Sequence, residues 1–188
     1  MKRLLVLTGC TVLLLSGGCQ PSNRSKKPME VIIEQGGPFP SFLVGTWRAD
    51  TDGWEFVFGP DGTISSAVIA LGRVKLIPGQ VTTIPMRKGG KGIFEPGQWL
   101  VHYDPASREL TLQISLKHFH AELGKDVLEG KCTDIFVGQI SKDGKVWPVV
   151  WTAFPDYTAH TAKYPNYKLD TDLEYGMSKA LIFEKVLP

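Results

Sequence analysis

From residue 42 onward, apolar and polar side chains alternate along the chain, and this pattern limits the possible folds more than any other feature. The clearest run covers residues 109–122, in which the even positions from Leu110 to Leu116 are aliphatic and the odd positions between them are polar. A repeat of two places alternate side chains on opposite faces of a β-strand, so that one face can pack on a core. Because almost no segment in this region has the spacing of an amphipathic helix, the chain is predicted to be all-β.

Turn residues separate the alternating segments. Gly59-Pro60-Asp61-Gly62 lies between two of them, and Lys142-Asp143-Gly144-Lys145 lies between two others. Proline presets φ for a turn, glycine accepts a positive φ, and Asp-Gly is typical of tight hairpins. Strands joined in this way predict an antiparallel up-and-down sheet that closes into a β-barrel. A β-sandwich is the alternative, because its strands alternate in the same manner.

Short motifs occur within these strands and turns. The segment Leu43-Val44-Gly45-Thr46-Trp47 is followed by an aromatic strand and an Asp-Gly-Thr turn over residues 54–63. A second Gly-x-Trp, Gly97-Gln98-Trp99, precedes the Leu-Thr-Leu run at residues 110–112. These motifs resemble those of bacterial lipocalin-like, calycin-type domains. The resemblance implies a lipocalin-like barrel whose interior holds a small apolar molecule.

The same resemblance implies a structural role for one tryptophan. In that family the Trp of the first strand fills one end of the barrel and often lies under a basic side chain. This implies that Trp47 has a packing role, with Lys179 or Lys185 of the last strand as its partner. An indole suits such a position because it is large, and a cation over its face adds an attraction.

The N-terminus has the pattern of an export signal. Lys2 and Arg3 precede a mostly apolar run from Leu4 to Leu15, and small residues at 16–18 lead directly to Cys19. This arrangement is typical of a secretory signal peptide, and the run is shorter than the ~20 apolar residues of a membrane span. Small residues before a cysteine resemble the bacterial lipobox, in which that cysteine is acylated, although Ser16 stands where the lipobox usually has Leu.

This second resemblance implies a lipoprotein with three parts: a signal peptide at 1–18, a lipidated tether at 19–40 and the lipocalin-like barrel at 41–188. The acyl chains on Cys19, such as palmitate, would make the membrane its partner. The implied location is the bacterial cell envelope, at the outer membrane if the host is Gram-negative. The alternative is an ordinary secretory signal whose nearby cysteine is incidental.

Charge and cysteine content narrow the function further. The chain has 21 Lys and Arg against 19 Asp and Glu, and removal of Lys2 and Arg3 with the signal would leave equal numbers. The absence of a basic stripe from the sequence argues against nucleic acid as a partner.

After processing, Cys132 would be the one remaining free thiol, so we expect no intramolecular disulfide. Its place in an alternating segment predicts a small buried side chain.

The polar residues of greatest interest follow the long alternating run. His118, His120 and Glu122 continue the even positions of Leu110–Leu116, so they are expected on the inner face of the barrel near one rim. With Tyr103 of the preceding strand, His118 and His120 are the candidate ligand-binding residues, placed to hydrogen-bond at the mouth of an apolar pocket. Two imidazoles and a carboxylate could also hold a transition metal, but ligands on one strand reach poorly around an ion, so no metal site is predicted. A third possibility is that the strand bends or ends near Lys117 and turns His118, Phe119 and His120 to solvent.

No catalytic motif is present in the sequence. It contains no Gly-x-Ser-x-Gly, His-Glu-x-x-His or Cys-x-x-Cys. Carboxylates such as Asp50, Asp52, Asp104 and Asp134 carry no evident reason for a perturbed pKa. We therefore expect a binding protein without a cofactor rather than an enzyme. The alternative is a non-enzymatic envelope protein with a filled barrel, which contacts a partner through its loops, such as the tyrosine-containing segment at 155–176.

Overall fold

The structure is a computed structural model that describes residues 27–69, 74–86, 89–166, 168 and 176–187. This part of the chain forms strands and one short helix, so the all-β prediction is confirmed. No helix within it is long and apolar enough to cross a membrane. The elements are β1 (Met29–Ile33), β2 (Gly45–Ala49), β3 (Glu55–Phe58), β4 (Ile64–Ile69), β5 (Val74–Leu76), β6 (Thr82–Pro85), β7 (Lys91–Pro96), β8 (Trp99–Asp104), β9 (Glu109–Leu123), β10 (Asp126–Gln139), β11 (Val146–Asp156), α1 (Thr158–Lys163) and β12 (Met177–Lys185).

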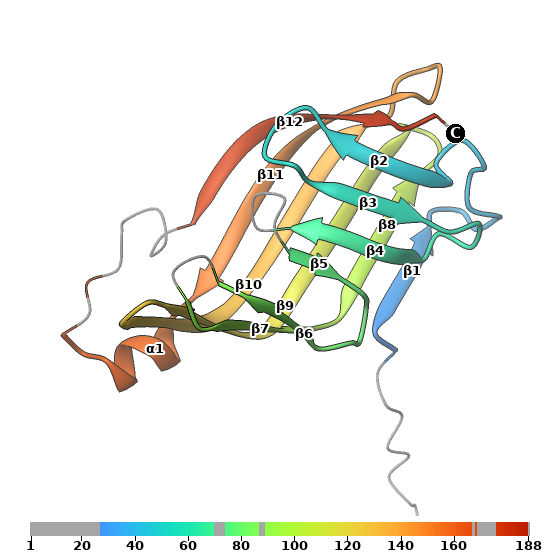
Figure 1. Cartoon of the computed structure of the whole chain (residues 1–188). Helices are drawn as coiled ribbons and strands as arrows, with labels where there is room; N and C mark the ends of the chain where they lie inside the picture. Colours follow the sequence, from blue (N-terminus) through green and yellow to red (C-terminus); the bar gives the residue numbers. More distant parts are fainter. Residues whose placement is uncertain (1–26, 70–73, 87–88, 167, 169–175, 188) are drawn as a thin grey trace, which may run out of the picture.

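The strands form one sheet in the order β1-β8-β9-β10-β11-β12-β2-β3-β4-β5, with β7 beside β9 and β6 beside β7. Most neighbours are consecutive in sequence and antiparallel, as predicted. The last strand, β12, pairs with β2, which brings the two ends of the meander together. The sheet folds over, so that β2, β3 and β4 lie in front of β8–β11 (Figure 1). Among the described strands the hydrogen-bonded order does not close on itself, so the chain is an all-β protein with one open sheet.

One strand departs from the antiparallel prediction. β1 pairs in parallel with β8, with Met29 opposite Trp99. Met29 is buried, and its sulfur accepts a hydrogen bond from the backbone N–H of Ile64 at 3.0 Å. Phe39 is also buried, and it stacks on Phe58 with ring centroids 5.9 Å apart. The folded part thus includes Met29 and Phe39, which the sequence prediction places in the tether at 19–40. The earlier part of the tether and the signal peptide lie outside the described residues.

Aromatic side chains fill the half of the interior where β2, β3, β11 and β12 meet. Phe56 stacks on Phe183 at 5.2 Å and meets Phe136 edge-on at 5.0 Å, measured between ring centroids. Trp147 lies against Phe183 at 5.2 Å, and all four side chains are fully buried. Offset and edge-on aromatic pairs add to the free energy gained by burial. This half of the sheet is therefore a packed core.

Trp47 is fully buried, which fits the expected packing role, and its indole N–H donates to the carbonyl of Leu43 at 2.8 Å. Lys185 lies opposite Trp47 in the β12–β2 register, and its ammonium donates to the carbonyl of Phe42 at 2.6 Å. The cation–π contact at this end is made by another pair, Arg108 over the Phe42 ring at 4.8 Å.

Lys179, the other expected partner of Trp47, lies elsewhere on β12. Its ammonium is 2.7 Å from a carboxylate oxygen of Asp52. Lys185 is thus the predicted basic residue that lies near Trp47, and its ammonium binds the backbone carbonyl of Phe42.

Candidate functional site

A β-bulge in the long hairpin of β9 and β10 decides which side chains reach the interior. Leu116 lies opposite Cys132, whereas Phe119 lies opposite Gly130, so two residues of β9 face the single residue Lys131 of β10. An extra residue in one strand moves all following side chains to the other face. Beyond the bulge the odd positions Phe119 and Ala121 are buried, in place of the even ones.

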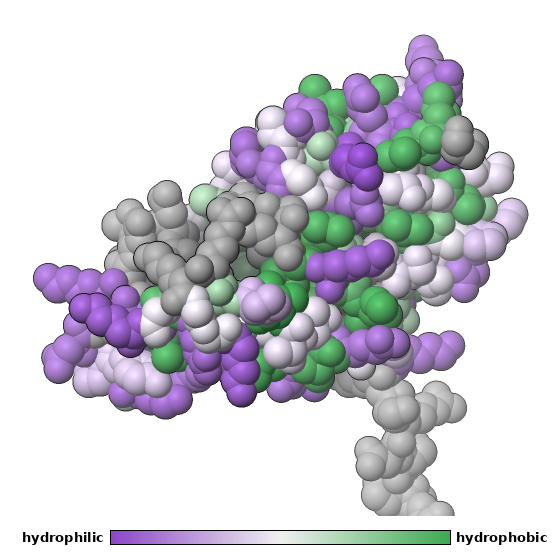
Figure 2. Space-filling view, viewed as in Figure 1, coloured by the Kyte–Doolittle hydropathy of each residue, from purple (hydrophilic) through white to green (hydrophobic). Residues whose placement is uncertain are grey.

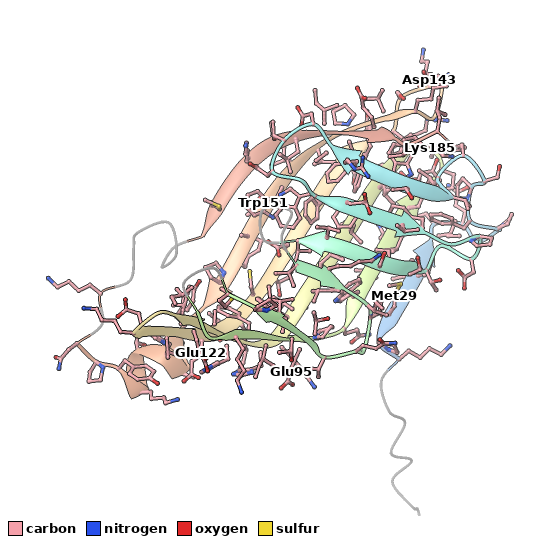
Figure 3. All side chains as sticks on the ribbon, viewed as in Figure 1. Met29, Glu95, Glu122, Asp143, Trp151 and Lys185 are labelled. Atoms are coloured by element: carbon pink, nitrogen blue, oxygen red, sulfur yellow. The ribbon has the colours of Figure 1, made fainter. Side chains whose placement is uncertain are left out.

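The bulge overturns the expected position of His118 and His120. Both lie on the outer face, as the third interpretation expected for the two histidines, but Phe119 between them is buried, which that interpretation did not expect. His118 Nδ1 is 3.8 Å from Glu95, and His120 Nδ1 is 3.2 Å from Glu129. Figure 3 shows Glu95 and Glu122 at the lower edge of the sheet, away from Trp151 in the interior.

His120 belongs to a polar cluster that ties α1 to the sheet. One oxygen of Glu129 accepts from His120, and the other accepts from the Lys163 ammonium at 2.9 Å. The hydrogen bond from Lys163 and that from His120 lower the pKa of Glu129. No group of three or more His, Cys, Asp or Glu side chains in the described ranges is arranged to hold a metal ion. The two hydrogen bonds of Glu129 join β10 to β9 and to α1.

Tyr103 lies at the opposite end of β9 from the two histidines, because it pairs with Leu110 near the start of that strand. Its side chain is buried and meets Phe42 edge-on at 6.3 Å. Burial raises the pKa of Tyr103 above its usual value, against a smaller opposing effect of Arg108. The structure does not bring Tyr103 together with His118 and His120, and it places none of the three in the pocket described next.

An apolar pocket of about 350 Å³ opens on the inner side of the sheet, in the half beyond the packed core. It lies where the bulged part of β9 and β10 faces the ends of β3 and β4. Trp151 stands in its wall, between the front and back strands (Figure 3). Its size falls in the range of small-molecule sites. The lining residues are Trp54, Ile69, Phe94, Leu116, Phe119, Cys132, Asp134, Trp151, Ala153, Pro155, Tyr157, Gly176 and Met177.

Two polar groups of β10 face this pocket. Asp134 is 5 % exposed, and burial raises its pKa to about 6, despite a hydrogen bond from the indole of Trp151 at 2.9 Å. Burial also raises the pKa of the Cys132 thiol to about 12, with a further contribution from the nearby Asp134. The thiol is therefore neutral, and the Cys132 side chain is partly buried, whereas its position predicts a buried one.

Sequence reasoning missed Asp134, although a signal was present. Cys132, Asp134 and Phe136 occupy alternate positions of one strand, so they share a face. Phe136 is fully buried in the packed core. A carboxylate between two inward-facing side chains must itself be buried, and burial is the usual cause of a raised carboxyl pKa.

The segment after β11 covers one side of the pocket. Tyr157 meets Phe119 edge-on at 5.9 Å, immediately before α1. A side chain at Gly130 would bring its Cβ within 2.7 Å of the Asp156 carbonyl, so glycine at the bulge lets this segment approach β10. Part of the tyrosine-containing segment at 155–176 is therefore a short helix packed on the sheet. Residues 167 and 169–175 lie outside the described residues.

Hydrophobic residues gather in the middle of the face seen in Figure 2, at the level of β4 and β5, between hydrophilic residues at the α1 end and along the upper edge.

Comparisons with protein-family models, with curated proteins and with solved structures found no match for this chain.

Proposed function

We propose that this chain is an exported, membrane-anchored lipoprotein whose β domain binds a small, largely apolar molecule. The observation that carries the binding proposal is the inner pocket of about 350 Å³ beside a core that is otherwise filled with aromatic side chains. The wall includes two indole rings, Trp54 and Trp151, whose centroids are 5.1 Å apart. Such rings supply a large apolar contact area at fixed positions.

Burial of apolar surface is the expected driving force for binding. A ligand that removes ~200 Å² of apolar surface from water would gain about 5 kcal/mol, before the loss of its translational and rotational freedom is subtracted. The wall belongs mostly to paired strands, so little ordering of the protein is required. These features support a preformed binding site.

Titration with the uncharged fluorophore N-phenyl-1-naphthylamine tests the pocket. The protein would be the chain from residue 19 with Cys19→Ser, exported with an ordinary signal peptide, so that no acyl chain competes. Ala153→Phe should fill the pocket and weaken binding at least tenfold, because Ala153 lines it. Val150→Phe is the matched control on the same strand, since Val150 is 55 % exposed on the outer face. Binding by Ala153→Phe as tight as that of the unaltered chain would contradict the proposal.

The membrane anchor rests on the lipobox resemblance at Cys19. Nine residues lie between Cys19 and the start of β1 at Met29, so ten Cα–Cα steps join the two. A fully extended chain of that length spans at most about 35 Å, so an acylated Cys19 would hold the domain close to the membrane surface. Metabolic labelling with a palmitate analogue should mark the chain, and Cys19→Ser should abolish the label. Equal labelling of Cys19→Ser would exclude this anchor.

A second candidate function is that of an interaction protein of the envelope, and one observation favours it. Val150 is 55 % and Ile182 is 43 % exposed on the outer face of β11 and β12, and the register places Pro148 beside Ile182 and Ala180 beside Val150. Clustered apolar residues on a surface are typical of contact sites. Crosslinking in the native host should then lose a protein partner on a Val150→Lys, Ile182→Lys double substitution. Unchanged recovery would remove this candidate.

A further inference from the structure

Among the described residues that line the apolar pocket, Asp134 is the one acidic residue, and its position in the wall restricts the ligand. Asp134 projects from β10 among aromatic and aliphatic side chains and is 5 % exposed. Its Oδ1 accepts the indole N–H of Trp151 at 2.9 Å. Its second oxygen, Oδ2, has no hydrogen bond to another residue in the described part of the chain. This oxygen is not sealed from solvent.

A carboxylate in such a wall affects different ligands in opposite ways. A purely apolar ligand would displace water from the second oxygen and leave a buried acceptor unsatisfied, which is unfavourable. A ligand with an N–H or O–H group at that point would supply the missing hydrogen bond. A ligand carboxylate would meet a like charge in a low dielectric and be repelled.

We propose that the pocket selects small apolar molecules that carry one hydrogen-bond donor, a hydroxyl or an ammonium group, and that Asp134 is the residue that binds this donor. This inference rests on the proposed binding function and names the class of ligand for the same pocket.

The charge of Asp134 separates the two kinds of donor. The titratable residues among the described lining are Asp134 and Cys132 of β10 and Tyr157 after β11, and the other lining side chains cannot ionise. Burial raises the pKa of Asp134 to about 6 and that of Cys132 to about 12, so Asp134 ionises near neutrality while the thiol remains protonated. An ammonium ligand should gain affinity relative to a hydroxyl ligand as the pH rises from 5 to 7.5.

Four probes with the same ring system test the selection: 2-naphthylmethanol, 2-naphthylmethylamine, 2-methylnaphthalene and 2-naphthoate. Calorimetric titration at pH 7.5 should give about tenfold tighter binding of the alcohol and the amine than of 2-methylnaphthalene, and no binding of 2-naphthoate. In Asp134→Leu the preference for donors should disappear while 2-methylnaphthalene still binds. Asp126→Leu, which removes an exposed carboxylate from the same strand, should keep the preference.

The outcomes distinguish this inference from the function on which it depends. Equal affinity for the three uncharged or cationic probes, or tightest binding of 2-naphthoate, would overturn the role of Asp134 and leave the apolar pocket intact. Binding of no probe by the unaltered chain would overturn both proposals. If Asp134→Leu unfolds, Asp134→Asn replaces it as the near-isosteric variant, and it should lose the pH-dependent gain of the amine over the alcohol. Retention of that gain would contradict the inference.

Discussion

The two halves of the β domain have the same kind of sheet but different interiors. Around Phe56 and Phe183 the aromatic rings are in direct contact and fully buried. Around Asp134 and Trp151 the same strands, β10 and β11, line a pocket of about 350 Å³. The difference arises from the bulge in β9 opposite Lys131, together with the smaller Cys132 and Ala153 in the pocket wall. One half is a packed core, and the other contains an apolar pocket.

The largest expected effect compares truncations in the two halves. Phe183→Ala should lower the free energy of unfolding by about 3–5 kcal/mol, because it removes a fully buried ring and leaves a cavity. Met177→Ala, at the rim of the pocket and 44 % exposed, should lower it by less than about 1 kcal/mol. Urea denaturation measures both. Similar losses for the two variants would show that the halves are equally packed.

The second prediction tests the bulge. Phe119→Ala should lower the free energy of unfolding by about 3 kcal/mol, because Phe119 is buried and packs against Tyr157. His118→Ala should change it by no more than about 0.5 kcal/mol, since His118 lies on the outer face. If the alternation of residues 110–116 continued unbroken, the order of the two effects would be reversed. Thermal and urea unfolding of the pair therefore decide on which face each residue lies.

The third prediction concerns the pH dependence that Asp134 causes. Burial raises its pKa in the folded state from 3.8 to about 6. Between these values the folded state binds more protons than the unfolded state, so this group lowers stability as the pH rises from about 4 to 6, by about 3 kcal/mol in total. Relative to the unaltered chain, Asp134→Asn should gain stability over that interval and keep the gain at higher pH.

The comparison with Asp134→Asn is necessary because other carboxylates act in the opposite sense. Hydrogen bonds from Thr63 and Ser107 lower the pKa values of Asp61 and Asp104, so these groups stabilise the fold above their unfolded pKa and lose that contribution in acid. Their contribution is the same in both proteins and cancels in the difference. A difference that stays constant between pH 4 and 7 would show that Asp134 is solvated.

The smallest expected effect concerns the contact between α1 and the sheet. Glu129→Gln should lower the global free energy of unfolding by less than about 1 kcal/mol, because one partner, Lys163, is solvent-exposed. Hydrogen exchange of the α1 amides should nevertheless become faster, since Glu129 holds Lys163 at 2.9 Å. Glu122→Gln, on the other side of His120, is the control. Unchanged exchange in α1 would mean that the contact between Glu129 and Lys163 does not hold the helix on the sheet.

Much of the fold could be predicted from local pattern. The alternation before Leu116 places Leu110, Leu112 and Ile114 in the core, where the structure has them fully buried. The Asp-Gly turns at 61–62 and 143–144 join the paired strands β3 and β4, and β10 and β11, as expected. Such features are local, because strand periodicity and turn conformation depend on adjacent residues.

The candidate site could not be predicted in the same way. His118 and His120 were assigned to the inner face because the alternation was extended through a bulge, and a single extra residue reverses every later assignment. Asp134 was overlooked as one acidic residue among many. Its environment depends on Trp54 before β3, Ile69 of β4 and Trp151 of β11, which are distant from Asp134 in the sequence.

The order of neighbouring residues is enough to specify that this chain forms a β domain, where its main hairpins turn and which aliphatic side chains before Leu116 are buried. Three other features depend on how the strands pair and fold over one another: β1 joins the sheet in parallel, a bulge between β9 and β10 turns the histidines outward, and Asp134 stands in an apolar pocket. The period of two in any single strand carries no information about its pairing partner or about a bulge.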